Sequence, residues 1–86
     1  MAHIFAGTID TQGEWKVLSE QIDKTLTANK TYTIQCLQPT YLRQGNEVEG
    51  GNFIDNISLF TIWTYDGSTD LYIKTYGTST VIVSED

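Results

Sequence analysis

Apolar and polar residues alternate along several short stretches of this chain, which is the pattern of half-buried β-strands. The alternation is clearest over residues 31–37, where Tyr32, Ile34 and Cys36 fall on one face and polar residues on the other. Strands are expected over residues 15–18, 31–37, 40–43, 53–57, 59–65, 71–76 and 80–84. Short strands at this spacing predict an all-β fold, either a small antiparallel two-sheet β-sandwich (jelly-roll-like) or a small barrel.

Turn-forming residues separate the last three predicted strands. Residues 66–70 read Asp-Gly-Ser-Thr-Asp, and residues 77–79 read Gly-Thr-Ser. Such residues favour tight turns between neighbouring strands. We therefore expect the strands at 59–65, 71–76 and 80–84 to form an antiparallel meander, in which each strand pairs with the next.

Residues 19–27 carry two conflicting signals. Leu18, Ile22 and Leu26 recur at the spacing of one helix face, which a two-turn helix would also give. The threonines of this segment favour extended backbone instead. The interpretation preferred here is a loop with a short strand.

The N-terminal residues 1–14 are expected to form an extended arm ahead of a single β-sandwich domain, which covers residues 15–86. The apolar residues of this arm are Ile4, Phe5 and Ile9, and they are unusual for a solvated tail. These three residues are candidates for docking contacts. Docking would add the arm as a strand to the exposed sheet edge of a neighbouring molecule.

The composition agrees with strands. Of 86 residues, 13 are Thr, 9 are Ile and 4 are Val, so β-branched side chains are abundant. A chain of this length forms one domain with a thin core, and such domains usually need disulfides, a metal or partner subunits. Its single cysteine, Cys36, cannot form an intrachain disulfide or an all-cysteine zinc site. We expect Cys36 to be a small buried residue.

The charge balance narrows the choice of partner. Eleven acidic and five basic residues give a net charge of -6. This excess argues against nucleic acid and against an anionic membrane surface, since both demand Lys and Arg. The first residues lack the basic and apolar regions of a secretory signal, which favours a reducing cytosol as the place of synthesis.

Candidates for catalysis and metal binding are weak. The one histidine, His3, cannot supply a conventional catalytic triad, and a small sandwich offers little cleft, so we expect no enzymatic activity and no cofactor. Asp66 and Asp70 could contribute to a calcium site, but a plain hairpin turn is favoured. Residues 44–52 form a polar loop that contains Glu47 and Glu49, and Asp55 follows in the next expected strand. We interpret these three acidic residues as solvent-exposed and not as a metal site.

Aromatic residues are the most informative candidates. Trp63, Tyr65, Tyr72 and Tyr76 lie in two predicted strands that carry large residues on both faces. If the four share one outward face, they form a patch that fits a subunit interface, where Tyr and Trp are enriched. Such a patch could instead stack on sugar rings, and each residue taken singly could pack in the core.

The order of these segments resembles small tailed-phage virion structural proteins, namely head-decoration, fibre or tail-accessory β-sandwich modules. The similarity covers about residues 14–86. This sequence departs from that group at Pro39 and in the acidic loop that contains Glu47 and Glu49. The segments that carry the similarity are Trp-Lys-Val-Leu at 15–18, Lys-Thr-Tyr-Thr-Ile-Gln at 30–35, Gly-Asn-Phe at 51–53, Phe60, Asp-Leu-Tyr-Ile-Lys at 70–74 and Val-Ile-Val-Ser-Glu at 81–85.

This resemblance implies a structural role without catalytic residues. The protein would form a homo-oligomer, a trimer or larger, and would dock on the capsid or tail of a virion assembled in the host cytoplasm. The alternative is a carbohydrate-binding or host-receptor-binding module, in which the same aromatics stack on a glycan and Asn52, Asp66 and Asp70 form hydrogen bonds. A small acidic domain of this kind could also mask a basic surface on a host protein.

Overall fold

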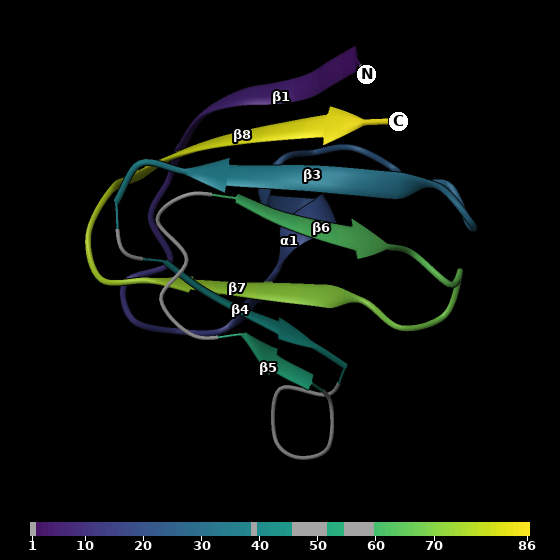
Figure 1. The fold of residues 1–86 in the computed structure, drawn as a ribbon. Helices are drawn as coiled ribbons and strands as arrows, with labels where there is room; N and C mark the ends of the chain where they lie inside the picture. The colour runs from purple at the N-terminus through teal and green to yellow at the C-terminus, as the bar shows by residue number, and fades with distance from the viewer. Residues whose placement is uncertain (1, 39, 46–51, 55–59) are drawn as a thin grey trace.

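The computed structural model describes residues 2–38, 40–45, 52–54 and 60–86, and no side chain is described for residues 52–54 and 60. The described residues form eight strands and one short helix (Figure 1). In chain order these are β1 (Ala2–Ile9), β2 (Lys16–Val17), α1 (Leu18–Gln21), β3 (Thr31–Cys36), β4 (Thr40–Gln44), β5 (Asn52–Ile54), β6 (Phe60–Thr64), β7 (Leu71–Thr75) and β8 (Ser79–Glu85).

The strands build two antiparallel four-stranded sheets that pack face to face. The first sheet has the order β1-β8-β3-β6, and the second has the order β2-β7-β4-β5. Apart from the β4–β5 pair, each strand is followed in the chain by a strand of the other sheet. Eight strands that alternate between two sheets in this order form two interleaved Greek keys, the jelly-roll arrangement. The expected all-β, two-sheet sandwich is therefore confirmed.

The predicted meander of the last three strands is wrong. β6 pairs with β3, β7 pairs with β2 and β4, and β8 pairs with β1 and β3. The turns at residues 66–70 and 77–79 therefore connect the two layers instead of adjacent strands. Alternation along a strand indicates which face is buried, but it contains no information about which strand lies alongside.

The expected N-terminal arm is also wrong, because residues 2–9 are an integral edge strand. β1 pairs with β8 from Ala2 opposite Glu85 to Ile9 opposite Ser79, with an irregularity between His3 and Phe5. The extended backbone is as expected, but the sheet edge to which it adds belongs to its own chain and not to a neighbouring molecule. The three docking candidates are used within the fold: Ile9 is buried, and Ile4 and Phe5 pack against the core.

The core lies between the two sheets and follows the alternation of the central strands. The buried apolar side chains are Ile9, Leu18, Ile22, Tyr32, Ile34, Cys36, Leu42, Trp63, Leu71, Ile73, Val81 and Val83. Cys36 is buried as expected, and burial raises the pKa of its thiol. The Tyr32 hydroxyl donates to Glu85 Oε2 at 2.7 Å and accepts from the Thr27 N–H at 2.7 Å, which ties the end of β8 to the loop before β3.

Residues 18–21 form a single helical turn, α1, so the loop-and-strand interpretation of residues 19–27 is wrong at its start. Leu18 and Ile22 are buried, as the helical spacing indicates. The turn ends where Asp23 adopts a φ of 55°, in the left-handed region. No helix in the described part of the chain is long and apolar enough to cross a membrane.

The turn between β6 and β7 is stabilised by one carboxylate. Asp66 Oδ1 accepts hydrogen bonds from the backbone N–H groups of Ser68, at 2.8 Å, and Thr69, at 2.7 Å. These bonds favour the charged form and lower the pKa of Asp66 from 3.8 to about 2. Among the described residues, no group of three His, Cys, Asp or Glu side chains is placed to hold a metal ion. The acidic cluster Glu47, Glu49 and Asp55 lies outside the described residues.

The Asp66 carboxyl provides a prediction about acid titration. In a two-dimensional NMR titration, its carboxyl resonance is expected to shift with a midpoint near pH 2, about where its pKa lies. Because the folded-state pKa is depressed, the stability that this turn contributes is present above about pH 4 and is lost as the pH falls toward 2. A midpoint near 4 would contradict the hydrogen bonds described here. Asp66→Asn is the matched control, since it keeps the acceptor oxygen and removes the titration.

Candidate docking surface

The four aromatic candidates do not share one face. Trp63 is buried at 6% exposure, with its ring centroid 6.1 Å from that of Tyr32 and 5.5 Å from that of Tyr65. Tyr65 is half-buried at the margin of the core. Tyr72 and Tyr76 belong to the other sheet, in β7 and just beyond it. The single patch fails because β6 and β7 lie in different layers.

A different aromatic surface lies on the outer side of the second sheet. In the β4–β7 register, Tyr41 is opposite Lys74 and Arg43 is opposite Tyr72. The residues that alternate with them, such as Leu42 and Ile73, are buried inside the sandwich. Directly opposed residues in an antiparallel pair point to the same side. We call this surface the aromatic face; its residues are Trp15, Tyr41, Arg43, Tyr72, Lys74 and Tyr76.

Lys74 lies at the centre of the aromatic face. Its Nζ is 4.8 Å from the ring centroid of Trp15 and 5.4 Å from those of Tyr41 and Tyr76. Tyr41 and Tyr76 meet edge to face, with centroids 5.9 Å apart and planes at 86°. The Arg43 guanidinium lies 5.9 Å from the Trp15 centroid. Such cation–π contacts contribute roughly 0.5–2 kcal/mol each, so these side chains are held in place.

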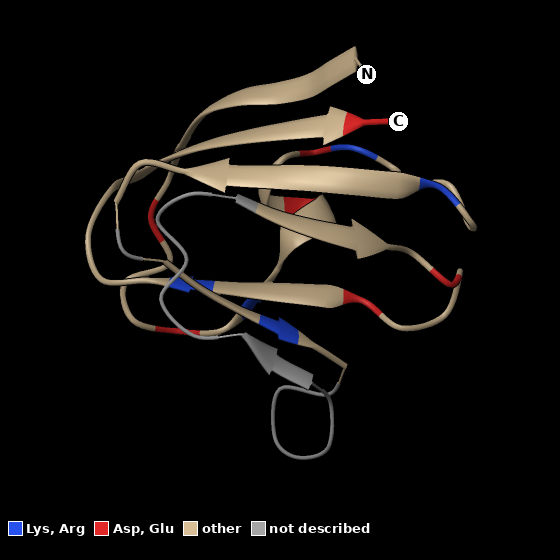
Figure 2. Ribbon diagram, in the orientation of Figure 1, with Lys and Arg blue, Asp and Glu red and all other residues tan. Residues whose placement is uncertain are grey.

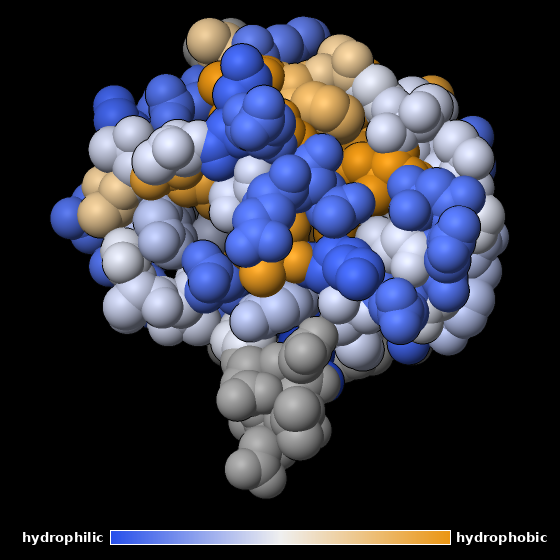
Figure 3. All heavy atoms as spheres, turned by 180° about the vertical axis from the view of Figure 1, so that it is seen from behind, coloured by the Kyte–Doolittle hydropathy of each residue, from blue (hydrophilic) through white to orange (hydrophobic). Residues whose placement is uncertain are grey.

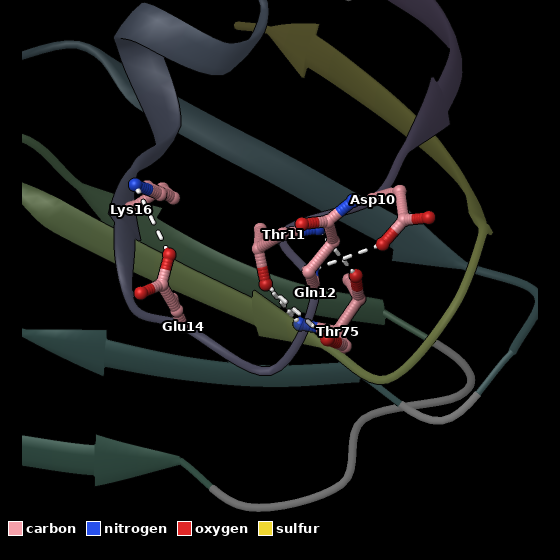
Figure 4. A network of polar contacts seen from close by, with 6 residues as sticks. All are labelled: Asp10, Thr11, Gln12, Glu14, Lys16 and Thr75. Carbon is pink, nitrogen blue, oxygen red and sulfur yellow. Dashed lines mark hydrogen bonds and ion pairs between the residues drawn. The ribbon is translucent and has the colours of Figure 1, made fainter.

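A hydrogen-bond network beneath this surface positions the segment that carries Trp15 (Figure 4). The Thr11 N–H donates to Thr75 Oγ1 at 2.9 Å, and the Thr75 N–H donates to Thr11 Oγ1 at 2.8 Å. The Thr11 hydroxyl also donates to the Thr75 carbonyl at 3.2 Å. These buried bonds fasten the β1–β2 connection to the end of β7. On either side of Trp15 in the chain, Glu14 and Lys16 form an ion pair, with Lys16 Nζ 3.5 Å from Glu14 Oε2.

Gly13 is required at its position by both conformation and space. Its φ is 78°, and its N–H donates to the Thr75 carbonyl at 2.7 Å. A Cβ at this position would lie 3.2 Å from Cε1 of Tyr76. The backbone of residue 13 therefore forms part of the support on which the Tyr76 ring rests.

We expect Gly13→Ala to lower the free energy of unfolding by about 1–2 kcal/mol, because an L-residue is strained in the left-handed region. The same change should displace the Tyr76 ring from its contact with Tyr41. Urea denaturation measures the first effect, and the chemical shifts of the Tyr76 ring protons report the second. Gly77→Ala, at a φ of 96° and with no heavy atom within 4 Å of its added Cβ apart from its own residue and its chain neighbours, should reproduce the strain with a smaller effect on the ring. A Tyr76 ring that does not move in Gly13→Ala would contradict the contact described here.

An acidic pocket lies at the opposite end of β7. Its volume is about 340 Å³. One side is formed by α1 and the segment that follows it, and the other side by the turn between β6 and β7. Three carboxylates line it against a single ammonium group, and its apolar wall is a tyrosine ring and a leucine. The lining residues are Ser19, Glu20, Asp23, Lys24, Thr25, Leu26, Tyr65 and Asp70. We call this site the acidic pocket.

Two of the sequence candidates, Tyr65 and Asp70, therefore meet in the acidic pocket, while Tyr72 and Tyr76 belong to the aromatic face. Sequence reasoning missed Trp15, Tyr41 and Arg43, since their places depend on the pairing of distant strands. The signal for Lys74 was available: in the stretch Tyr-Ile-Lys-Thr-Tyr at residues 72–76, alternation places the lysine between two tyrosines on one face.

The side of the molecule that Figure 3 shows is mostly hydrophilic. On the side seen in Figure 3, hydrophobic residues reach the surface only in small areas between hydrophilic ones. Large apolar side chains that are exposed among the described residues are Leu37, Ile62 and Tyr76. Of these, only Tyr76, at 69% exposure, belongs to the aromatic face.

Comparisons with known proteins add no relative: no family model, no curated protein and no solved structure matches this chain.

Proposed function

We propose that this protein is a non-enzymatic structural subunit of a bacteriophage virion, which associates with copies of itself and docks on capsid or tail proteins. The observation that carries the proposal is the aromatic face, an ordered surface of tyrosine, tryptophan and basic side chains on an otherwise acidic domain. The resemblance of the strand segments to small phage structural proteins supports it. So does the jelly-roll order of the strands, which is an architecture of viral capsid domains and of lectins.

The aromatic face has the properties of a protein-binding surface. Tyr, Trp and Arg are the residues most enriched at interface hot spots. Lys74 packs against three rings, so these side chains are already restrained before a partner arrives. Restraint of this kind lowers the entropy cost of binding. A thin-cored domain of 86 residues also gains stability by covering such a surface.

The direct test is quantitative mass spectrometry of phage particles purified by density gradient from the host that produces this protein. We expect the protein to remain with the particles in multiple copies per capsid, whereas a cytosolic host protein of similar abundance is removed. Loss of this chain from the particles together with the cytosolic control would refute the virion role.

The acidic pocket favours a second candidate function, a carbohydrate-binding or receptor-binding module. It combines a half-buried tyrosine ring with carboxylate and hydroxyl groups, which are the groups that stack on and hydrogen-bond to a sugar. Asp70 and Tyr65 are two of the residues that this alternative requires. Asn52 lies in β5, where no side chain is described.

A glycan array followed by calorimetry decides between the two functions. A glycan that binds the wild type and Tyr76→Ala but not Tyr65→Ala would favour the binding module. Absence of any glycan hit would reject the module and leave the structural role as the function to pursue.

A further inference from the structure

We infer that the aromatic face of one copy of this chain binds the acidic pocket of a second copy, so that the subunits associate head to tail. Lys74 of the first copy would face the mouth of the second copy's pocket, toward the carboxylates of Glu20, Asp23 and Asp70. This inference rests on the self-association in the proposed function and specifies the two surfaces involved.

The two surfaces are opposite in charge. Arg43 and Lys74 give the aromatic face its charge, and the described side chains on the outer rows of β4 and β7 include no Asp or Glu. In the acidic pocket, three carboxylates outnumber the one ammonium group, that of Lys24. With a net charge of -6 per chain, two copies repel each other unless a local match of this kind brings them together.

Within the part of the chain that the structure describes, Lys74 forms no ion pair, and neither do the carboxylates of Glu20, Asp23 and Asp70. The ion pair found there is Lys16 with Glu14. Lys74 instead contacts three aromatic rings, and none of the described carboxylates is its counter-ion. A carboxylate of a second copy can therefore form an ion pair with Lys74.

One molecule cannot bring its own two surfaces together. Asp70 immediately precedes β7 (Leu71–Thr75), and Lys74 lies near the other end of the same strand. Figure 2 shows a red segment at the start of the β7 ribbon and a blue segment near its arrowhead. A rise of four residue steps along extended chain separates their backbones by about 13 Å, and β7 is held rigidly between β2 and β4. The match can therefore be made only between copies.

Both surfaces also carry apolar groups next to their charges. Tyr76 projects from the aromatic face beside Lys74 at 69% exposure. The acidic pocket offers an apolar wall formed by Tyr65 and Leu26, next to its carboxylates. The acidic pocket can therefore contact Tyr76 and Lys74 of another copy at the same time. Because the two surfaces differ, the contact is heterologous and generates rings or open chains, and a ring would have three or more subunits in keeping with the expected oligomer.

The test uses two variants of the full chain, each with one surface reversed in charge. Lys74→Glu reverses the aromatic face, and Glu20→Lys/Asp70→Lys reverses the acidic pocket. All of these side chains are exposed or half-buried, and circular dichroism checks that each variant is folded. Sedimentation equilibrium then gives the dissociation constant of each protein alone and of an equal mixture.

We expect each variant alone to associate at least about tenfold more weakly than the wild type, since each surface then meets a like charge. The mixture should associate again, because the intact face of one variant meets the intact pocket of the other. Lys30→Glu is the matched control: it makes the same change of net charge at an exposed lysine that is neither in the face nor in the lining of the pocket, so it should lose much less affinity than Lys74→Glu.

Two results would overturn the inference while leaving self-association intact. In one, the pocket variant associates like the wild type, which would indicate a face-to-face contact. In the other, both variants are weakened but the mixture does not recover. A wild type that remains monomeric at every concentration would overturn both this inference and the self-association on which it rests.

Discussion

Replacing Ile34 with alanine is expected to lower the free energy of unfolding by about 2–5 kcal/mol, the range measured for large-to-small changes in cores. Ile34 lies in the middle of β3, between β8 and β6, and its exposure is 0%. Alanine would leave a cavity between the two sheets. Since small domains are stabilised by only about 5–15 kcal/mol in total, the variant should unfold at a much lower urea concentration.

Ile62→Ala is the matched control for this change. Ile62 lies on the neighbouring strand β6, and its side chain is 64% exposed on the outer face of the first sheet. The same truncation there should change the free energy of unfolding by less than about 0.5 kcal/mol. Equal losses in the two variants would contradict the assignment of inner and outer faces in the first sheet.

Thr75→Val is expected to cost about 1–3 kcal/mol, although valine has nearly the same shape as threonine. The change removes the acceptor of the buried Thr11 N–H, at 2.9 Å, and leaves that donor without a partner. Because Thr11 starts the connection that leads to Trp15, the aromatic face should also loosen. Thermal denaturation measures the loss, and the fluorescence of Trp15 in a Trp63→Phe background reports the change at the surface.

Thr78→Val provides the comparison for Thr75→Val. Thr78 is exposed in the turn between β7 and β8, so the same substitution should have little effect on stability or on Trp15 fluorescence. If Thr75→Val were equally neutral, the buried network would not be what fastens the β1–β2 connection to β7.

Local features of this fold follow from the sequence more reliably than its pairing does. The buried row of β3 is the one that alternation predicts, with Ile34 inward, whereas β7 carries large residues on both faces and only the structure shows that Ile73 is the inward one. The partners of these strands could not be predicted, because any strand with one apolar face can pair with several others. The N-terminal segment shows the same limit: the sequence predicts that it is extended and pairs with a sheet edge, but not that this edge is β8 of its own chain.

The candidate site shows the same limit. The sequence predicts Tyr72 and Tyr76 on one strand face, and the structure agrees; for Trp63 it leaves a shared patch and the core open, and the structure shows the core. A tryptophan in an alternating strand is apolar enough for the core and suitable for an interface, and only its layer decides between them. Trp15 and Tyr41 join Lys74 only because β2, β7 and β4 are neighbours in the second sheet.

The measurement that tests most directly whether the aromatic face is a docking surface is the molar mass of the wild type and of Lys74→Glu, by light scattering across a range of concentrations. We expect the wild type to rise above the 9.7 kDa of one chain as its concentration increases, with a smaller rise at high salt. The Lys74→Glu variant should remain near 9.7 kDa over the same range. A wild type that stays at 9.7 kDa throughout, or a variant that assembles equally well, would contradict the assignment of this surface.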